Sequence, residues 1–324
     1  MKKMLLNPIQ RKFWMDYLLK FPSAEYNDPN YTFIVRGDLS ITDLKKAYQL
    51  ITLEYFPMHS TVQVEDGKPY FCLDEDENKF PFIFFGEEED TSDAAIKELI
   101  TKYVYQPFDL QREYPCRFYV IQRGKDYFLF HMFHHLVMDG QTLQIFFHRL
   151  SVIYNELIRG EYRFVDQTGM METFNASFER EYLRTKEENT NYWKNYLQDI
   201  PSFLSVPRFS FENSEKENKE NISYAFDLGH DLYEKAKYFC KEQATTHFRL
   251  YANVWALTLS KVLNVNRLLL DHTLSMRSKN QEELLGVFIN NLPLKYDFQD
   301  ENCTFYDIVQ FSNINRKEEK LHQY

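Results

Sequence analysis

Residues 127–140 read YFLFHMFHHLVMDG, and this stretch decides the fold of the chain. Its first seven residues are apolar at nearly every position, which is typical of a central β-strand covered on both faces. Beyond Gly140, apolar residues recur every three or four positions as far as Leu157, and Arg159-Gly160 supplies a helix C-cap. The stretch is therefore predicted to join a buried strand to an amphipathic helix, and such connections expose side chains in α/β proteins.

Helices and strands are predicted on both sides of this connection. Before it, N-caps at Asn7, Ser40 and Ser92 begin three helices, and turns at Asp66-Gly67 and Gly124 close two hairpins. After it, a polar helical segment reaches about residue 200 and a charged loop covers 214–220. A second set of elements follows: strands Ile222–Leu228, Leu268–Leu274 and Val287–Tyr296, and helices Leu232–Lys241 and Phe248–Leu263. The pattern predicts an α/β protein (an α+β sandwich) with two lobes, at residues 1–170 and 171–324.

The composition excludes several classes of protein. The 324 residues are 44% hydrophobic and 17% aromatic, which places the chain among globular proteins. A net charge of −10 argues against a nucleic-acid partner, which clustered lysines and arginines would bind. No run of eighteen apolar residues and no signal-peptide core is present, so a cytoplasmic protein without a membrane partner is expected. The four cysteines form no C-x-x-C pair, and neither a zinc site nor a disulfide framework is predicted.

The seven residues His134 to Gly140 have the pattern H-H-x-x-x-D-G. Such a match arises by chance in a chain of this length about once in a thousand cases. Paired histidines at a strand end are nevertheless most often packed or surface residues, and a satisfied buried histidine is one interpretation of His135. Gly-rich phosphate loops, G-x-S-x-G elbows and metal-ligand spacings are all missing from the sequence, so no cofactor and no metal bound to this chain is predicted.

The order of motifs along the chain resembles that of the condensation domains of nonribosomal peptide synthesis. Six segments carry the resemblance. They are the opening helix at 8–14, the P-F-D-L segment at 107–110, the H-H-x-x-x-D-G motif at 134–140, the Y-W pair at 192–193, Arg277 after a strand, and L-G-V-F-I-N-N-L-P-L at 285–294.

This resemblance implies two chloramphenicol-acetyltransferase-like lobes that form a V, with an active-site tunnel between them. It also implies donor and acceptor peptidyl carrier proteins as partners, whose phosphopantetheine arms carry the substrates. One carrier would present an acyl or peptidyl thioester and the other an aminoacyl thioester whose amine attacks. The implied activity is that of an acyltransferase that forms an amide (peptide) bond.

The family's motif assigns roles to residues of this chain. Histidine titrates near neutral pH, so His135 suits a base or a positioning group for the attacking amine, and we predict it to be the catalytic residue. His134 points to the other side of an extended segment and is expected to hold the turn. Asp139 is expected to cap the helix and pair with an arginine, and Gly140 to provide close backbone approach or a positive φ. The predicted motif-supporting residues are His134, Asp139, Gly140 and Arg277. Met138, Gln141, Asn290 and Asn291 are candidates for lining the tunnel or positioning substrate.

The sequence departs from the family pattern at three places. Gln141 and Thr142, which follow Gly140, stand where the family usually has W-S. Ser60 stands where the family has an arginine that braces the motif aspartate, and Arg277 could replace it. Residues 321–324 resemble the beginning of the family's H-Q-x-Y-P-F segment, so a second lobe truncated at its C-terminus is expected. Three other functions stay open: a standalone acyltransferase that uses coenzyme A thioesters, an epimerase, and a non-catalytic module that docks carrier proteins.

Overall fold

The computed structural model describes residues 2–22, 31–74, 76, 79–86, 92–104, 106–200, 225–300 and 302–324. Contacts between residues group them into two compact units. The first unit is Met1–Leu183 with Ser275–Asn290, and the second is Arg184–Leu274 with Asn291–Tyr324. The predicted lobes at 1–170 and 171–324 stay a prediction, because compact grouping does not establish which segments fold independently. The V and its tunnel likewise stay predictions.

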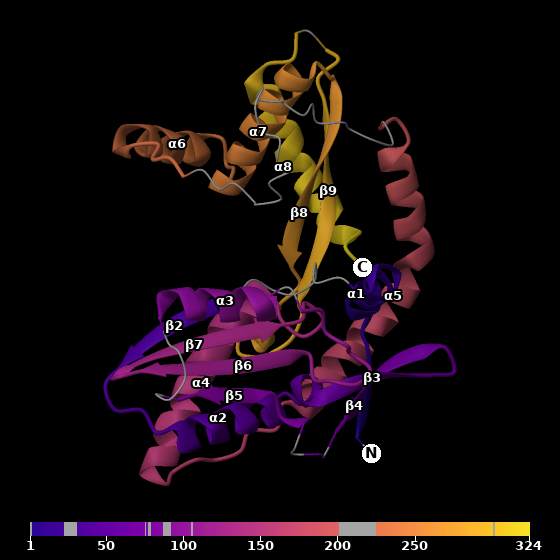
Figure 1. Ribbon diagram of the computed structural model, residues 1–324. Helices are drawn as coiled ribbons and strands as arrows, with labels where there is room; N and C mark the ends of the chain where they lie inside the picture. The colour runs from indigo at the N-terminus through magenta and orange to yellow at the C-terminus, as the bar shows by residue number, and fades with distance from the viewer. Residues whose placement is uncertain are drawn as a thin grey trace, which may run out of the picture. The chain divides into compact units, whose positions relative to one another are not determined.

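A four-stranded sheet forms the centre of the first unit (Figure 1). The strand order is β2 (Tyr31–Arg36), β7 (Asp126–Phe133), β6 (Cys116–Arg123) and β5 (Phe82–Phe85). β7 pairs antiparallel with both of its neighbours, whereas β5 and β6 run parallel. The central strand predicted from its continuous apolar sequence is therefore confirmed, and the sheet presents the end of this strand to the H-H-x-x-x-D-G motif.

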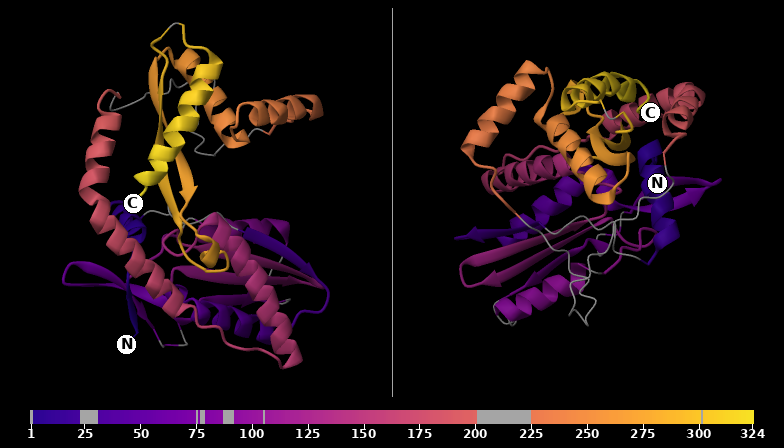
Figure 2. Two further views of the ribbon diagram at one scale, coloured as in Figure 1. Left: turned by 180° about the vertical axis from the view of Figure 1, so that it is seen from behind. Right: turned by 90° about the horizontal axis from the view of Figure 1, so that it is seen from above.

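Helices cover both faces of this sheet (Figure 2). Successive residues of a strand point to opposite faces, and here Phe118 and Tyr119 of β6 do so. The Phe118 ring stacks on Tyr48 of α2 (Ile41–Glu54) and on Phe146 of α4 (Gly140–Arg159). The Tyr119 ring stacks on Tyr103 of α3 (Asp93–Val104). The main core therefore lies between the sheet and the α2–α4 pair, and α3 closes the opposite face.

A second, three-stranded sheet of the first unit has the order β1 (Lys3–Leu5), β4 (Lys68–Leu73) and β3 (Ser60–Glu65). α1 (Pro8–Lys20) begins as predicted at Asn7, which forms a capping box with Gln10. The remaining elements of this unit are the 3₁₀ helices η1 (Phe56–His59) and η3 (Lys279–Gln281) and the first part of α5 (Thr168–Leu197). The predicted mixed α/β class is confirmed.

The second unit holds α6 (His230–Glu242), α7 (His247–Leu263), α8 (Phe305–Leu321) and the paired strands β8 (Arg267–Ser275) and β9 (Ile289–Asp297). Its buried core consists of Ala256, Leu268, Leu294, Tyr296 and Ile308. The predicted strand Ile222–Leu228 is wrong over residues 225–228, which form no strand. There the Asp227 carboxylate accepts the Gly229 N–H at 2.8 Å, and Gly229 takes φ 76°, so the chain turns into α6. Residues 222–224 and the predicted loop at 214–220 lie outside the described residues.

All four cysteines are free thiols, and Cys72, Cys116 and Cys240 are buried. In the part of the chain that the structure describes, every helix is too short or too polar to cross a membrane.

Glu54, at the end of α2, is fully buried, and its side chain accepts four hydrogen bonds from three residues. Its carboxylate accepts two hydrogen bonds from Arg149 of α4, one from the Tyr162 hydroxyl and one from the Val165 N–H. We expect Glu54→Gln to lower the free energy of unfolding by about 1–3 kcal/mol, because a buried carboxylate partner of Arg149 is lost. Arg149 keeps Glu156 at 3.8 Å, which limits the cost. Urea unfolding of the variant measures the change, and a loss below about 0.5 kcal/mol would contradict it.

Candidate active site

The H-H-x-x-x-D-G motif lies where β7 ends and α4 begins, within the first unit. The His134 N–H donates to Pro115 O at 2.8 Å and so continues the pairing of β7 with the segment before β6. The Val137 N–H then donates to His134 O at 3.0 Å, which closes a turn over His134 to Val137. A strand paired on both sides thus fixes the start of the motif, and the helix cap at Asp139 fixes its end.

His135 is half-buried, and its ring is oriented by a backbone acceptor. Its Nδ1 lies 2.7 Å from Met138 O. A carbonyl oxygen only accepts, so Nδ1 carries the proton in this bond and the neutral ring has its lone pair on Nε2. The ring of Phe13 from α1 lies 4.8 Å from the His135 ring, centroid to centroid, at an interplanar angle of 49°. A neutral imidazole held in this tautomer can accept a proton at Nε2.

His134 is buried, with 2% of its surface exposed. The Leu136 N–H donates to its Nδ1 at 3.0 Å, so the ring bridges the turn and, when neutral, carries its proton on Nε2. The rings of Tyr17 and Phe108 each form a T-shaped pair with it. Burial, with a smaller contribution from neighbouring His135, lowers the pKa of His134 to about 3, and the ring is neutral at pH 7.

This pKa predicts an acid-sensitive contribution to stability. The folded value lies below the ordinary value of 6.5, so unfolding takes up a proton at mildly acid pH. The contribution is complete above about pH 6.5 and is lost as the pH falls toward about 3. Between pH 7 and pH 5 the wild type is expected to lose about 2 kcal/mol more than His134→Asn, whose amide can still accept the Leu136 N–H. Urea unfolding at both pH values measures the difference, and equal losses would contradict the prediction.

Asp139 is buried and its carboxylate has three partners. One oxygen accepts the Thr142 N–H at 2.7 Å, which makes Asp139 the N-cap of α4. The other oxygen accepts the Phe288 N–H at 2.8 Å. The third partner is the Arg277 guanidinium, which lies 3.7 Å from the Asp139 carboxylate. The capping and the arginine pair expected of Asp139 are both present, and they tie the start of α4 to residues 277–288.

Arg277 is held by more than its ion pair. Its guanidinium donates to Gln281 O and Leu284 O, each at 2.7 Å, and to the Thr142 hydroxyl. The group also lies over the Phe288 ring, 4.1 Å from its centroid. Ser60, which replaces the family arginine, is buried and donates instead to Phe56 O at 2.6 Å. Arg277 therefore occupies the position beside Asp139, and the serine hydroxyl is bound within its own turn.

The other predicted residues lie in different surroundings. Gly140 is the first residue of α4, its φ is not positive, and a Cβ there would meet nothing within 4 Å, so the expected backbone reason for this glycine is wrong. Met138 has a buried side chain in the main core and offers only its carbonyl to His135.

The three predicted polar residues lie on two elements. Gln141 is exposed on α4, while Asn290 and Asn291 lie on β9. The Asn291 side chain accepts the Thr273 hydroxyl at 3.0 Å. Roles of these residues toward substrate stay predictions.

Sequence reasoning missed three residues whose contacts hold the motif. Thr142 donates its hydroxyl to Gly286 O and accepts from Arg277, which joins α4 to the segment before β9. Gln10 of α1 donates to Leu136 O at 3.1 Å. Phe13 contacts the His135 ring. Gln10 and Phe13 lie in the opening motif and share one helix face at a spacing of three, which was the available signal. Thr142 was marked only as a departure from the family's usual W-S after Gly140, and that departure did not indicate its contacts.

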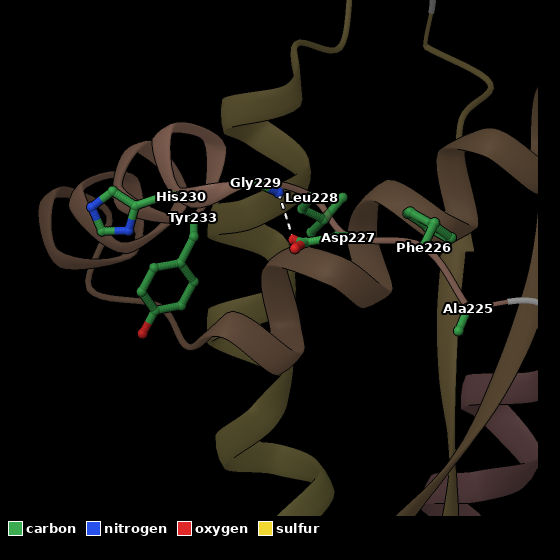
Figure 3. A pocket seen from close by; sticks show the side chains of 7 residues that line it. All are labelled: Ala225, Phe226, Asp227, Leu228, Gly229, His230 and Tyr233. Atoms are coloured by element: carbon green, nitrogen blue, oxygen red, sulfur yellow. Dashed lines mark hydrogen bonds between the residues drawn. The ribbon is translucent and has the colours of Figure 1, made fainter.

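A pocket in the second unit contains none of the predicted site residues (Figure 3). It is lined by Ala225, Phe226, Asp227, Leu228, Gly229, His230 and Tyr233. These seven residues are exposed, and the hollow lies on the surface of the unit. Among the described residues, no group of three or more His, Cys, Asp or Glu side chains is arranged to hold a metal ion.

Comparison with known proteins identifies the family. The family described as Condensation domain matches residues 1–324. The chain belongs to the condensation-domain family. This condensation domain is 24% identical over 282 residues to bacitracin synthase 3 of Bacillus licheniformis, a match that covers 84% of this chain and 4% of the synthase. It is 22% identical over 303 residues to CymA of Salinispora arenicola, a probable non-canonical nonribosomal peptide synthetase. This match covers 89% of this chain and 4% of CymA. The chain thus spans a small part of the length of these relatives.

Solved structures share the fold of this condensation domain. The first condensation domain of the CDA synthetase gives a TM-score of 0.75 at 17% identity and covers 99% of this chain and 76% of its own. A four-domain nonribosomal peptide synthetase bound to AMP and glycine gives 0.82 at 18% identity, with coverage of 100% and 24%. The X-domain from teicoplanin biosynthesis gives 0.79 at 16% identity, with coverage of 100% and 72%. At these identities the likeness establishes the fold alone.

Proposed function

We propose that this condensation domain is an acyltransferase that forms an amide bond between two carrier-bound substrates. The donor is an acyl or peptidyl thioester, and the acceptor is the amine of an aminoacyl thioester. The amine nitrogen attacks the donor carbonyl, a C–N bond forms, and the C–S bond of the donor thioester breaks. The phosphopantetheine arms that carry both substrates belong to partner carrier proteins, so this chain supplies binding and proton transfer.

The observation that carries this proposal is the orientation of His135. Its Nδ1 is engaged by Met138 O, which leaves the lone pair of the neutral ring on Nε2. An amine that attacks a thioester must lose a proton, and a neutral imidazole beside it can accept that proton and pass it to the departing thiolate. Atoms and charges then balance without a metal or a redox group. The half-buried position of His135 gives the ring access to substrate.

The surroundings of His135 support a rigid site. Asp139, Thr142 and Arg277 form a buried hydrogen-bonded cluster immediately after Met138. A rigid neighbourhood keeps a catalytic group in its productive geometry, and small displacements are costly in rate. The contact of Arg277 with Asp139 supplies the brace that the serine at position 60 does not.

Two other functions share this fold. A standalone acyltransferase would use a free coenzyme A thioester as donor. A docking module would bind carriers without turnover. The X-domain from teicoplanin biosynthesis has been solved in complex with OxyB, and it has the same fold at a TM-score of 0.78. The imidazole tautomer at His135 favours turnover, because docking alone does not need an oriented base.

The decisive experiment mixes the protein with a donor-loaded and an acceptor-loaded carrier protein and follows amide formation by mass spectrometry. A second reaction replaces the donor carrier with the matching coenzyme A thioester. Product that requires both carriers supports the proposal. Product from the coenzyme A thioester at an equal rate would instead indicate the standalone acyltransferase. Carrier binding in a pull-down without product in either reaction would indicate the docking module.

A further inference from the structure

Two side chains of α1 contact the turn that contains His135. Gln10 lies at the third position of the helix and is 1% exposed. Its amide accepts the Asn7 N–H at 3.1 Å through Oε1 and donates to Leu136 O at 3.1 Å through Nε2. Because both partners are backbone groups, the Gln10 amide links the start of α1 to the residue that follows His135.

Gln10 is itself held in place. The Asn7 side chain accepts the Gln10 N–H at 2.9 Å and donates to Asn175 of α5 at 3.3 Å. Asn175 in turn donates to Leu5 O at 3.4 Å. A buried amide with both ends bonded, on a helix start anchored to β1 and α5, has little freedom to rotate. The first turn of α1 therefore offers a fixed donor to the backbone at Leu136.

Phe13 lies three residues after Gln10, on the same face of the helix. Its ring contacts the His135 ring, 4.8 Å away between centroids. The N–H bond on His135 Nδ1, which donates to Met138 O, lies in the plane of the imidazole, whereas the Phe13 ring is tilted by 49° from that plane. These two contacts oppose different rotations of the imidazole. The hydrogen bond from Gln10 to Leu136 O restrains the backbone next to His135.

We propose that Gln10 and Phe13 are positioning residues, which hold His135 in the single tautomer and orientation needed for proton transfer. This inference rests on the proposed function for its effect on rate. Its effect on the imidazole can be measured independently of any reaction. A general role of α1 in stability can be distinguished from this positioning role. Ile9 is buried in the same turn of the helix, but its hydrocarbon side chain can form no hydrogen bond to the motif, so its substitution tests the stability of α1 alone.

The test uses Gln10→Met, which keeps the shape and removes both side-chain hydrogen bonds, and Phe13→Leu, which removes the ring. Ile9→Val is the matched control. In the carrier assay, Gln10→Met and Phe13→Leu are each expected to lower kcat about 10- to 100-fold with KM within about twofold of wild type, because misplacement of a catalytic group affects the chemical step. Ile9→Val is expected to stay within about twofold of wild type in both constants.

Imidazole ¹⁵N NMR at neutral pH gives the second measurement. The wild type is expected to show His135 as the tautomer protonated on Nδ1, and both variants a mixture of tautomers. Variants with wild-type kcat and an unmixed tautomer would overturn the inference. A lowered kcat with an unmixed tautomer would overturn it as well, since the loss would then have another origin. If the wild type forms no amide, the proposed function fails, and the NMR spectra alone decide the positioning role.

Discussion

Replacing His135 with alanine is expected to lower the rate of amide formation about 100- to 10 000-fold while the protein stays folded. General base catalysis by a positioned histidine is typically worth this factor. The fold should survive because His135 is half-buried and its Nδ1 bonds to Met138 O, which can bind water after the ring is removed. The measurement is the initial rate of product formation from two loaded carriers, by mass spectrometry, for wild type and variant.

The matched control for this experiment is His148→Ala. His148 lies on the exposed side of α4, in the same unit, and is not part of the motif. Its removal is expected to change the rate less than twofold. Circular dichroism and a thermal unfolding curve for each variant establish that folding is retained. Equal rates for His135→Ala and wild type would remove His135 as an essential group, whereas equal losses in both histidine variants would point to a general effect of substitution.

Replacing Asp139 with alanine is expected to lower the free energy of unfolding by about 3–5 kcal/mol. Asp139 and Arg277 have side chains that are 1% and 4% exposed, so removing the carboxylate leaves a buried guanidinium without its counter-charge. The Thr142 and Phe288 N–H groups lose their acceptor at the same time. The activity should fall with it, because Asp139 follows Met138, whose carbonyl orients His135. Urea unfolding followed by fluorescence gives the change.

The double variant Asp139→Ala/Arg277→Met separates the two causes of this loss. If the cost comes from the stranded charge, the double variant is expected to be less destabilised than the sum of the single variants, by about 0.5–3 kcal/mol. Asp139→Asn serves as a second comparison, since its amide oxygen can still cap α4. A loss below about 1 kcal/mol in Asp139→Ala would show that the cluster contributes little to folding.

Local signals in the sequence predicted most elements of the first unit. The cap at Asn7, the Asp66-Gly67 turn and the continuous apolar run of β7 each depend on neighbouring residues, and each prediction is confirmed. The failure at 225–228 has the same origin. Its apolar residues fit a strand, but the Asp227 turn onto Gly229 competes locally for the backbone. The sequence pattern does not reveal which of two local preferences prevails.

The candidate site was predictable as a motif and less so as an arrangement. The family resemblance identified His135 and Asp139 as motif residues and suggested that Arg277 pairs with Asp139. This ion pair is present. The hydrogen bonds of Gln10 to Leu136 O and of Thr142 to Gly286 O join residues that are 126 and 144 positions apart. No helical or strand period relates such residues, so only the tertiary fold reveals these contacts. Gly140 was assigned a steric reason that its open surroundings do not support.

The contacts that hold the motif also divide its neighbourhood into two classes of position. Leu136, Met138 and Phe288 contribute backbone atoms to these hydrogen bonds, which do not depend on the side chain at those positions. Gly286 also contributes its carbonyl, but its φ is 151° and a Cβ there would lie 2.9 Å from the Phe288 ring, so this position requires glycine. Gln10, Asp139, Thr142 and Arg277 take part through side-chain atoms, and a residue without a matching donor or acceptor removes the bond. The hydrogen bonds of the site therefore place no demand on the side chains of the first class apart from Gly286, whereas the side chains of the second class must keep a matching donor or acceptor.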